Sequence, residues 1–344
     1  MKVNKVRLMI NMLLICILLL TTVSLAWFIR NKTGEKRPLE LRSMNIGNAL
    51  DAPRNQPWDV KMNSDYFTII KKAGFNSVRL PVRFSDYAKD NSNYVLGEAF
   101  MKQVDGYIKE ALDQKLTIIL DLHHFQEIMK NPKQYHKCFL RIWQQLSERY
   151  KNYPSGLIFE VLNEPQENLE GKLWNKYMAE AIKIIRKSNP TRTIIVGPDN
   201  YYSLDRLNAL KIPKDDHLVV SFHYYEPNTF TFQKSPYLGF QKYHDVQWNG
   251  SSHEVDIIKS NFSEVKKWAD EHDVSIYLGE FGANKEAPYE SRLRWTKEVR
   301  EQAEKYGFSW GYWEFASLFG IYDAQNNNWD QQMLRTLIPN SKDK

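Results

Sequence analysis

Cysteine is scarce in this sequence, which has only two in 344 residues. Cys16 lies in an apolar run near the N-terminus and Cys138 in a segment with helical periodicity, so we do not expect them to pair. A disulfide framework is therefore excluded. Because a free cysteine on a helix usually serves as a small core residue, thiol catalysis at Cys138 is not expected. Cys16 also has no small residue before it, which disfavours a lipoprotein anchor.

The chain also lacks a large excess of charge of one sign. Its 47 Lys and Arg residues and 41 Asp and Glu residues give a formal net charge of +6. No basic run is interleaved with aromatic residues, and we find no internal repeat or low-complexity tract. The sequence therefore gives little support for nucleic-acid binding.

Aromatic residues, in contrast, are abundant. They make up 13% of the chain and include 10 Trp and 19 Tyr residues. Such numbers are consistent with a Trp-rich core, but they also suggest exposed surfaces on which a planar or ring-shaped ligand could stack.

An apolar run from Leu8 to Ile29 follows Lys2, Lys5 and Arg7. As a helix rising about 1.5 Å per residue it would cover roughly the ~30 Å hydrocarbon core of a bilayer. It is longer than the usual ~7–15-residue core of a signal peptide. We therefore favour an uncleaved membrane anchor, with cleavage near Ala26 as the alternative.

These features divide the chain into three parts. Residues 1–30 are expected to form the anchor or signal peptide, residues 31–38 a polar linker, and residues 39–344 one domain. Basic residues flank both ends of the apolar run, so the positive-inside rule gives little direction. Large domains translocate largely regardless of charge, and we place this one on the outer face of the membrane, or secreted if the segment is cleaved.

The domain alternates strand-like and helical segments. Eight short apolar runs are expected as strands, and helical periodicity falls between them. The expected strands are Leu41–Ile46, Ser77–Val82, Thr117–Leu122, Leu157–Leu162, Thr193–Val196, Leu218–Phe222, Ser275–Leu278 and Phe308–Trp313. The expected helices are Ser64–Ala73, Glu98–Gln114, Lys137–Tyr150, Leu173–Lys187, Ser203–Leu210, Val255–His272, Tyr289–Tyr306 and a last one after Trp329.

Eight alternating units predict an α/β fold in which parallel strands close into a (β/α)8 TIM barrel. An open doubly wound sheet is the alternative, but no Gly-rich phosphate loop follows the first strand. The longest irregular segment, about Glu226 to Gly250, carries several aromatic residues, and loops of that length are usually functional.

Polar and ionisable residues recur where the expected strands end, which is the face that carries active sites in such barrels. Packing alone does not explain this recurrence. The residues concerned are Asn45, Gly47, Asn48, Asp51, Arg79, Asp121, His123, His124, Asn163, Glu164, His223, Tyr225, Glu226, Glu280, Trp313 and Glu314.

Two glutamates, Glu164 and Glu280, stand out among them because each follows a buried strand far from the other in sequence. A pair of carboxylates suits glycoside hydrolysis, in which one protonates the departing sugar oxygen and the other attacks or activates water at the anomeric carbon. Arg79 beside Glu280 would keep that carboxylate ionised, and Tyr225 could donate a hydrogen bond to it. A histidine near Glu164 would help to tune the acid.

The ordered set Ser77-Val-Arg79-Leu-Pro, His123-His124, Asn163-Glu164-Pro165, His223-Tyr-Tyr225, Gly279-Glu280-Phe-Gly and Trp313 resembles glycoside hydrolase family 5. The resemblance runs from about Met44 to Leu337 and is to compact bacterial endo-β-1,4-glucanases in particular. It implies a retaining (β/α)8 enzyme that uses no cofactor and no metal ion.

By this resemblance Glu164 is the acid/base and Glu280 the nucleophile, with Arg79, His223 and Tyr225 supporting them. Substrate contacts are expected from Asn163, which would meet the sugar 2-hydroxyl, and from His123, His124, Trp313, Asn48 and Asp51. The segment Gly47–Pro53 resembles a branch of the family that also acts on mannans. That branch has Glu where this chain has the shorter Asp51, so the choice between glucan and mannan stays open.

Several residues keep a structural alternative. Asp51 and Asn48 could cap their own loop. Trp313 could be a core residue, and one of His123 and His124 a buried core histidine, although we favour His123 as the sugar contact. Asp121 and Glu314 could be partner charges.

The expected partner is a β-linked glycan, a β-1,4-glucan first, with mannan or an exopolysaccharide made by the same cell as alternatives, and the enzyme is expected to be a monomer. Two other functions are weighed against this. One is a metal-dependent hydrolase that uses His123, His124, His223 and Asp121, which Arg79 disfavours because its positive charge would compete with a metal ion. The other is a non-catalytic glycan-binding protein.

Overall fold

The structure, a computed structural model, describes residues 39–88, 92–236 and 238–339. Eight parallel strands pair in sequence order, and the first also pairs with the last, so that the sheet closes into a barrel. This confirms the predicted (β/α)8 barrel. The strands are β1 (Arg42–Asn45), β2 (Ser77–Val82), β3 (Thr117–Leu122), β4 (Leu157–Glu160), β5 (Ile194–Val196), β6 (Leu218–Tyr224), β7 (Ser275–Phe281) and β8 (Ser309–Tyr312).

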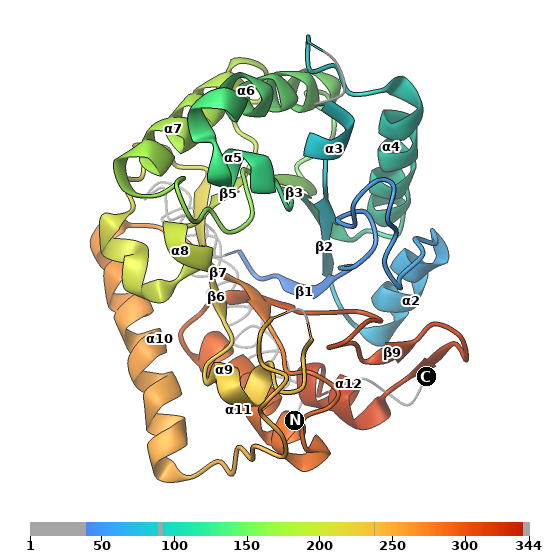
Figure 1. Cartoon of the computed structure of the whole chain (residues 1–344), viewed down its shortest axis with the longest axis vertical. Helices are drawn as coiled ribbons and strands as arrows, with labels where there is room; N and C mark the ends of the chain where they lie inside the picture. Colours follow the sequence, from blue (N-terminus) through green and yellow to red (C-terminus); the bar gives the residue numbers. More distant parts are fainter. Residues whose placement is uncertain (1–38, 89–91, 237, 340–344) are drawn as a thin grey trace, which may run out of the picture. The chain divides into compact units, whose positions relative to one another are not determined.

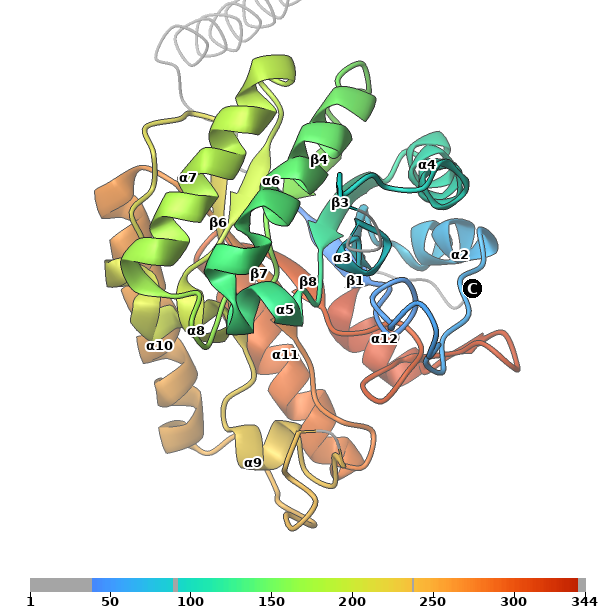
Figure 2. The ribbon, with the colours of Figure 1, turned by 45° about the horizontal axis from the view of Figure 1, so that its top comes forward.

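Helices surround the barrel, as Figures 1 and 2 show. The longer ones are α2 (Asp65–Ala73), α4 (Glu98–Asp113), α6 (Pro132–Arg149), α7 (Gly171–Ser188), α10 (Ser252–His272), α11 (Tyr289–Lys305) and α12 (Gln331–Leu337). Short helices lie in the connections: α3 (Ser85–Ala88), α5 (Gln126–Lys130), α8 (Asp199–Tyr202), the 3-10 helix η1 (Leu204–Ala209) and α9 (Asn228–Thr231). A small antiparallel pair, β9 (Tyr322–Asp323) and β10 (Asn328–Trp329), precedes α12.

Alternation along the strands explains how the barrel packs. On β2 the outward Val78, Leu80 and Val82 join the large core between strands and helices, while Ser77 and Arg79 point into the barrel. The lower barrel interior is a separate apolar cluster of Leu41, Ile119, Ile158, Ile195, Val219 and Tyr277. Above it the interior positions become polar and ionisable. The fold therefore collects charged groups at the carboxyl ends of its strands.

The predicted elements differ from the observed ones mainly at their ends. Strand β4 stops at Glu160 instead of Leu162, and α6 begins at Pro132 instead of Lys137. We expect a helix over Ser203–Leu210, and the structure has the six-residue 3-10 helix η1 there. Just before it, Asn200 and Tyr201 have left-handed backbone angles, which interrupt a regular helix.

No helix within the described ranges has both the length and the apolar character needed to cross a membrane. The predicted anchor, residues 1–30, and the predicted linker, residues 31–38, lie outside the described residues.

Candidate active site

A cleft of about 890 Å³ opens at the carboxyl ends of the strands. Glu164 and Glu280 both line it, so the structure brings together two residues 116 positions apart. Six further residues predicted for the site line the same cleft: Asn163, His123, His124, His223, Tyr225 and Trp313. Arg79, Asn48 and Asp51 are not among its lining residues.

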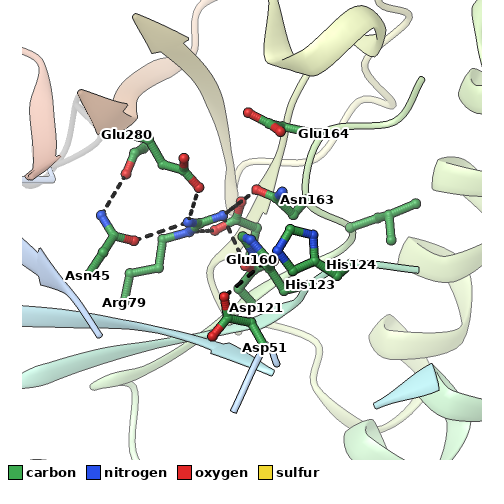
Figure 3. A network of polar contacts seen from close by, with 12 residues as sticks. Asn45, Asp51, Arg79, Asp121, His123, His124, Glu160, Asn163, Glu164 and Glu280 are labelled. Carbon is green, nitrogen blue, oxygen red and sulfur yellow. Dashed lines mark hydrogen bonds and ion pairs between the residues drawn. The ribbon is translucent and has the colours of Figure 1, made fainter. Parts of the chain in front are cut away.

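Arg79 lies fully buried beneath the cleft at the centre of a polar network (Figure 3). Its Nη1 donates to Glu280 Oε1 at 2.6 Å, and its Nη2 donates to Asn163 Oδ1 at 2.8 Å. Its Nε donates to Glu160 Oε2 at 2.7 Å, and Nη2 lies 3.0 Å from Asp121 Oδ2. One guanidinium therefore contacts carboxylates from β3, β4 and β7 and fixes their relative positions.

Glu160 was missed at the sequence level. It is the last residue of β4, completely buried, and it accepts two hydrogen bonds from Arg79. Its position two residues after Ile158, which belongs to the barrel interior, is the signal that could have revealed it. A carboxylate on the inner face of a strand needs a buried cation as partner.

Glu280 owes its orientation to an irregularity in β7. The register shifts at this point against both neighbouring strands, between Phe222 and His223 on β6 and between Leu278 and Phe281 within β7. Such a bulge re-aims a side chain, and Glu280 contacts Arg79. The hydroxyl of Tyr225 donates to its other oxygen at 2.8 Å.

The environment of Glu280 acts on its pKa in two directions. Burial raises the pKa above its usual value, while His223, the Arg79 cation and the Tyr225 hydrogen bond oppose this rise. Arg79 therefore lowers the pKa of Glu280, as predicted, but burial raises this pKa by more.

Glu164 lies four residues beyond the end of β4, not at its end as predicted. A backbone hydrogen bond from Asn163 N to Leu122 O holds this segment beside β3, and Glu164 has a left-handed φ of 48°. Burial raises the pKa of Glu164 to about 7, although Arg79 opposes the rise. A carboxyl group of this kind keeps its proton near neutral pH, as a general acid must.

His223 links the two glutamates. Its Nδ1 lies 2.6 Å from Glu164 Oε1 and 3.6 Å from Glu280 Oε2. One ligand atom from each of these three residues lies within 4.8 Å of the others, so the two carboxylates face each other at close range. Burial lowers the pKa of His223 to about 4, which leaves the imidazole neutral.

The two neighbouring histidines differ in their surroundings. His123 is buried, its Nδ1 contacts Asp121, and its ring stacks on Trp313 at 5.7 Å between centroids. His124 is more exposed and meets the ring of Trp58 edge-on at 5.5 Å. Both line the cleft, and which of them contacts a sugar stays a prediction.

Trp313 is half-buried and reaches the cleft because of a glycine. A Cβ on Gly47 would lie 2.6 Å from Trp313 Cη2, so a residue larger than glycine would displace the indole. Part of the Trp313 ring is buried and part is exposed. Its position is therefore compatible with both predicted roles, packing in the core and stacking on a sugar.

Asp51 and Asn48 have loop-capping contacts. The carboxylate of Asp51 accepts hydrogen bonds from the backbone N–H groups of Asn48 and Ala49, and Asp51 is completely buried. The Asn48 amide donates to Ser317 Oγ at 2.5 Å. Similarly, Glu314 accepts hydrogen bonds from the N–H groups of Ala316, Ser317 and Phe319. Asp51 and Asn48 thus make the loop-capping contacts that were one of their two predicted roles, the other being substrate binding.

The family model for cellulase (glycosyl hydrolase family 5) matches residues 34–317.

The chain belongs to glycosyl hydrolase family 5.

Relatives of this family 5 enzyme agree with that assignment. Endoglucanase H of Acetivibrio thermocellus is 32% identical over 303 residues, a match that covers 86% of this chain and 32% of that longer protein. Endoglucanase C of the same organism is 27% identical over 304 residues, covering 78% of this chain and 88% of that one. The protein is therefore a glycoside hydrolase, as the sequence predicted.

Solved structures with the same fold cover nearly all of the described residues. The clostridial cellulose synthase subunit Z from Clostridioides difficile matches with a TM-score of 0.86 and 54% identity, over 87% of this chain and 100% of that chain. Cel5A of Thermotoga maritima in complex with cellobiose matches with a TM-score of 0.84 and 38% identity, over 86% of this chain and 96% of that chain.

Two cleft-lining aromatic residues of this family 5 enzyme were not among the predicted substrate contacts. Tyr201, which is 54% exposed, stands beside Glu164 on the left-handed turn before η1. Phe232 from the long loop after β6 packs its ring against Tyr225 at 4.8 Å. Their spacing in the sequence gives no periodic signal, because both lie in irregular segments.

The histidines weighed as metal ligands fall into two groups. His123 and His124 cluster with Asp51, whereas His223 clusters with Glu164 and Glu280. Asp121 instead contacts Arg79 and His123. The four residues of the metal hypothesis therefore do not converge on one point, which argues against it.

Proposed function

We propose that this protein is a retaining endo-β-1,4-glucanase that cleaves glucan by double displacement. The observation that carries the proposal is the approach of Glu164 and Glu280 to within 4.8 Å at their nearest ligand atoms, inside one cleft. Retaining glycosidases hold their two carboxyl groups about 5–5.5 Å apart, whereas inverting enzymes need about 6.5–9.5 Å to admit a water molecule.

In the first step Glu280 attacks the anomeric carbon while Glu164 gives its proton to the departing sugar oxygen. A carbon–oxygen bond to Glu280 forms as the glycosidic bond breaks, and the leaving chain takes the proton. In the second step Glu164, now a carboxylate, removes a proton from water. That water attacks the anomeric carbon, releases Glu280 and leaves the anomeric configuration unchanged overall.

The residues around Glu280 and those around Glu164 favour different charge states of the two side chains. Arg79 and Tyr225 donate hydrogen bonds to Glu280, which favours its ionised form. Glu164 is contacted by His223, which is neutral, and it takes part in no ion pair with Arg79. The pair is thus divided into a nucleophile and an acid.

Glucan is the favoured substrate because several relatives are named endoglucanases. The Thermotoga maritima Cel5A was solved with cellobiose and also with mannotriose, which keeps mannan as the second candidate. A panel of purified β-glucans and mannans, with sizing of the products, tests this choice and the endo mode of cleavage.

We further propose that the enzyme is tethered to the outer face of the membrane and trims a β-glucan made by its own cell. The apolar run Leu8–Ile29 and the likeness to a cellulose synthase subunit support this. The full chain should sediment with membranes and release oligosaccharides from the cell's own polymer. A soluble full chain, or inactivity toward that polymer with activity on soluble glucans, would contradict it.

Azide rescue tests the two catalytic roles. Because azide can replace a missing carboxylate nucleophile, Glu280→Ala should regain activity on an aryl cellobioside and give the α-glycosyl azide. Glu164→Ala should give the β-glycosyl azide, since azide then attacks the glycosyl-enzyme. Exchanged products would reverse the roles, and binding of glucan without hydrolysis by the unaltered protein would favour the glycan-binding alternative.

A further inference from the structure

His223 contacts the two glutamates through only one of its ring nitrogens. The other nitrogen, Nε2, is buried and has no hydrogen-bond partner among the described residues. The hydroxyl oxygen of Ser221, two residues earlier on β6, is likewise buried and without a described partner. Buried polar atoms are rarely left unpaired because each costs the free energy of its lost hydration.

These two atoms face the same point. A Cβ added to Gly279 on the neighbouring strand β7 would lie 2.6 Å from Ser221 Oγ and 2.9 Å from His223 Nε2. Both atoms therefore lie against the side of Gly279 that carries no side chain, and any larger residue there would displace them. Ser221 and His223 alternate on the same strand, so both side chains point into the barrel.

The contacts of the first nitrogen decide which tautomer this arrangement needs. Nδ1 lies between oxygens of Glu164 and Glu280, at 2.6 and 3.6 Å. Carboxylate oxygens accept hydrogen bonds, so a proton on Nδ1 satisfies this side of the ring. In a neutral imidazole Nε2 is then a bare acceptor, and a hydroxyl is a suitable donor to it.

We propose that Ser221 is a positioning residue, whose hydroxyl holds one bridging water molecule that donates a hydrogen bond to His223 Nε2, and thereby holds His223 as the Nδ1–H tautomer. With its tautomer fixed, His223 keeps donating to Glu164 after that residue has given up its proton, without itself gaining or losing one. A hydrogen bond on the far nitrogen is a general way to set the tautomer of a functional histidine.

Several charged or titratable groups face His223 from other elements, and any test has to hold them constant. They are Arg79 on β2, His123 after β3, Glu160 on β4, Glu164 in the following segment, Tyr202 on α8 and Glu280 on β7. None of them is altered by a substitution at Ser221.

The direct test is ¹⁵N NMR of the protein labelled at histidine nitrogens, which separates protonated from unprotonated ring nitrogens. We expect Nδ1 of His223 to be protonated and Nε2 to be unprotonated. Ser221→Ala should move the spectrum toward the Nε2–H tautomer, and Ser221→Thr, which keeps a hydroxyl, should restore it. Ser85→Ala is the matched control, because Ser85 is also buried without a described partner but lies on α3.

An Nε2–H tautomer in the unaltered protein would overturn the proposal, and so would an unchanged spectrum in Ser221→Ala. A second readout rests on the proposed function: kcat in Ser221→Ala should fall roughly 2- to 10-fold, as expected for one lost hydrogen bond, with recovery in Ser221→Thr. Because the spectrum is independent of turnover, an inactive wild-type protein would refute the proposed function and leave the tautomer assignment to be judged separately.

Discussion

The two glutamates of the cleft differ in what surrounds each carboxyl group. Glu280 contacts a buried cation and a tyrosine hydroxyl, whereas Glu164 contacts a neutral histidine. Burial raises the pKa of both, and that of Glu164 to about 7. The two carboxyl groups thus have different neighbours, and in the proposed mechanism Glu164 carries the proton while Glu280 is ionised.

This difference predicts the pH dependence of kcat/KM. The general acid must carry a proton, so activity should fall as the pH rises through about 7, the pKa of Glu164. At low pH activity should fall as Glu280 becomes protonated, at a pH above the usual carboxyl range because its pKa is also raised. Initial rates on a soluble β-glucan from pH 4 to 9 would measure both limbs.

A substrate whose leaving group needs no proton provides the control. With a dinitrophenyl cellobioside, Glu164→Gln should lose the alkaline limb while keeping the first, glycosylation step. An alkaline limb that persists in this variant would assign the limb to another group.

At the scale of elements, the turn between β5 and η1 depends on one glycine. Asn200, Tyr201 and Tyr202 all have left-handed backbone angles, and the Tyr202 hydroxyl donates to Leu162 O at 2.6 Å. A Cβ on Gly197 would lie 2.6 Å from atoms of the Tyr202 ring. The Tyr202 ring also packs against the His223 ring, with 4.9 Å between their centroids. The turn therefore helps to hold His223 in position.

We therefore expect Gly197→Ala to lower the free energy of unfolding by ~1–3 kcal/mol, as is usual for overpacking. Gly106→Ala is the contrasting variant. Gly106 lies within α4, where an added Cβ meets nothing within 4 Å, so alanine should stabilise the protein by ~0.5–1 kcal/mol. Urea denaturation of both variants would measure these changes, and equal effects of one sign would refute the account.

At the scale of the whole molecule, the barrel is held from inside by charge as well as by apolar packing. Arg79 on β2 contacts Asp121 on β3, Glu160 on β4 and Glu280 on β7, all deeply buried. These contacts lie above the apolar floor of the barrel. Removing the cation would leave three buried carboxyl groups without the positive charge that they share.

Arg79→Met should therefore lower the free energy of unfolding by ~3–5 kcal/mol. Without Arg79 the pKa values of the three carboxyl groups rise further in the folded state. Groups with raised folded pKa values stabilise the fold at low pH and lose this contribution as the pH rises. The loss caused by Arg79→Met should accordingly be larger at pH 8 than at pH 5.

Arg149→Met is the matched control at the surface. Arg149 pairs with Glu98 and Asp105 in a partly exposed site, where an ion pair contributes ~0–1 kcal/mol. Guanidinium denaturation of both variants at the two pH values would test the contrast. Equal losses for Arg79→Met and Arg149→Met would show that the buried network does not stabilise the barrel as proposed.

The barrel and most of the candidate site could be predicted from the sequence. Alternation of apolar strands with periodic helices depends on local spacing, and in a parallel barrel every strand carries its terminal residues to the same face. Glu164, Glu280 and Tyr225, which lie at or just beyond strand ends, could be predicted for that reason, whereas Arg79 lies in the middle of β2.

Contacts between residues distant in the sequence could not be predicted from residue spacing. The burial of Glu160, the bulge that turns Glu280 toward Arg79, and the capping contacts of Asp51 depend on neighbours distant in the sequence. The pKa values of Glu164 and His223 likewise follow from burial, which exists only once the chain is folded. Residue types can therefore identify a pair of candidate carboxyl groups, whereas the proposal that one is the acid and the other the nucleophile rests on their three-dimensional surroundings.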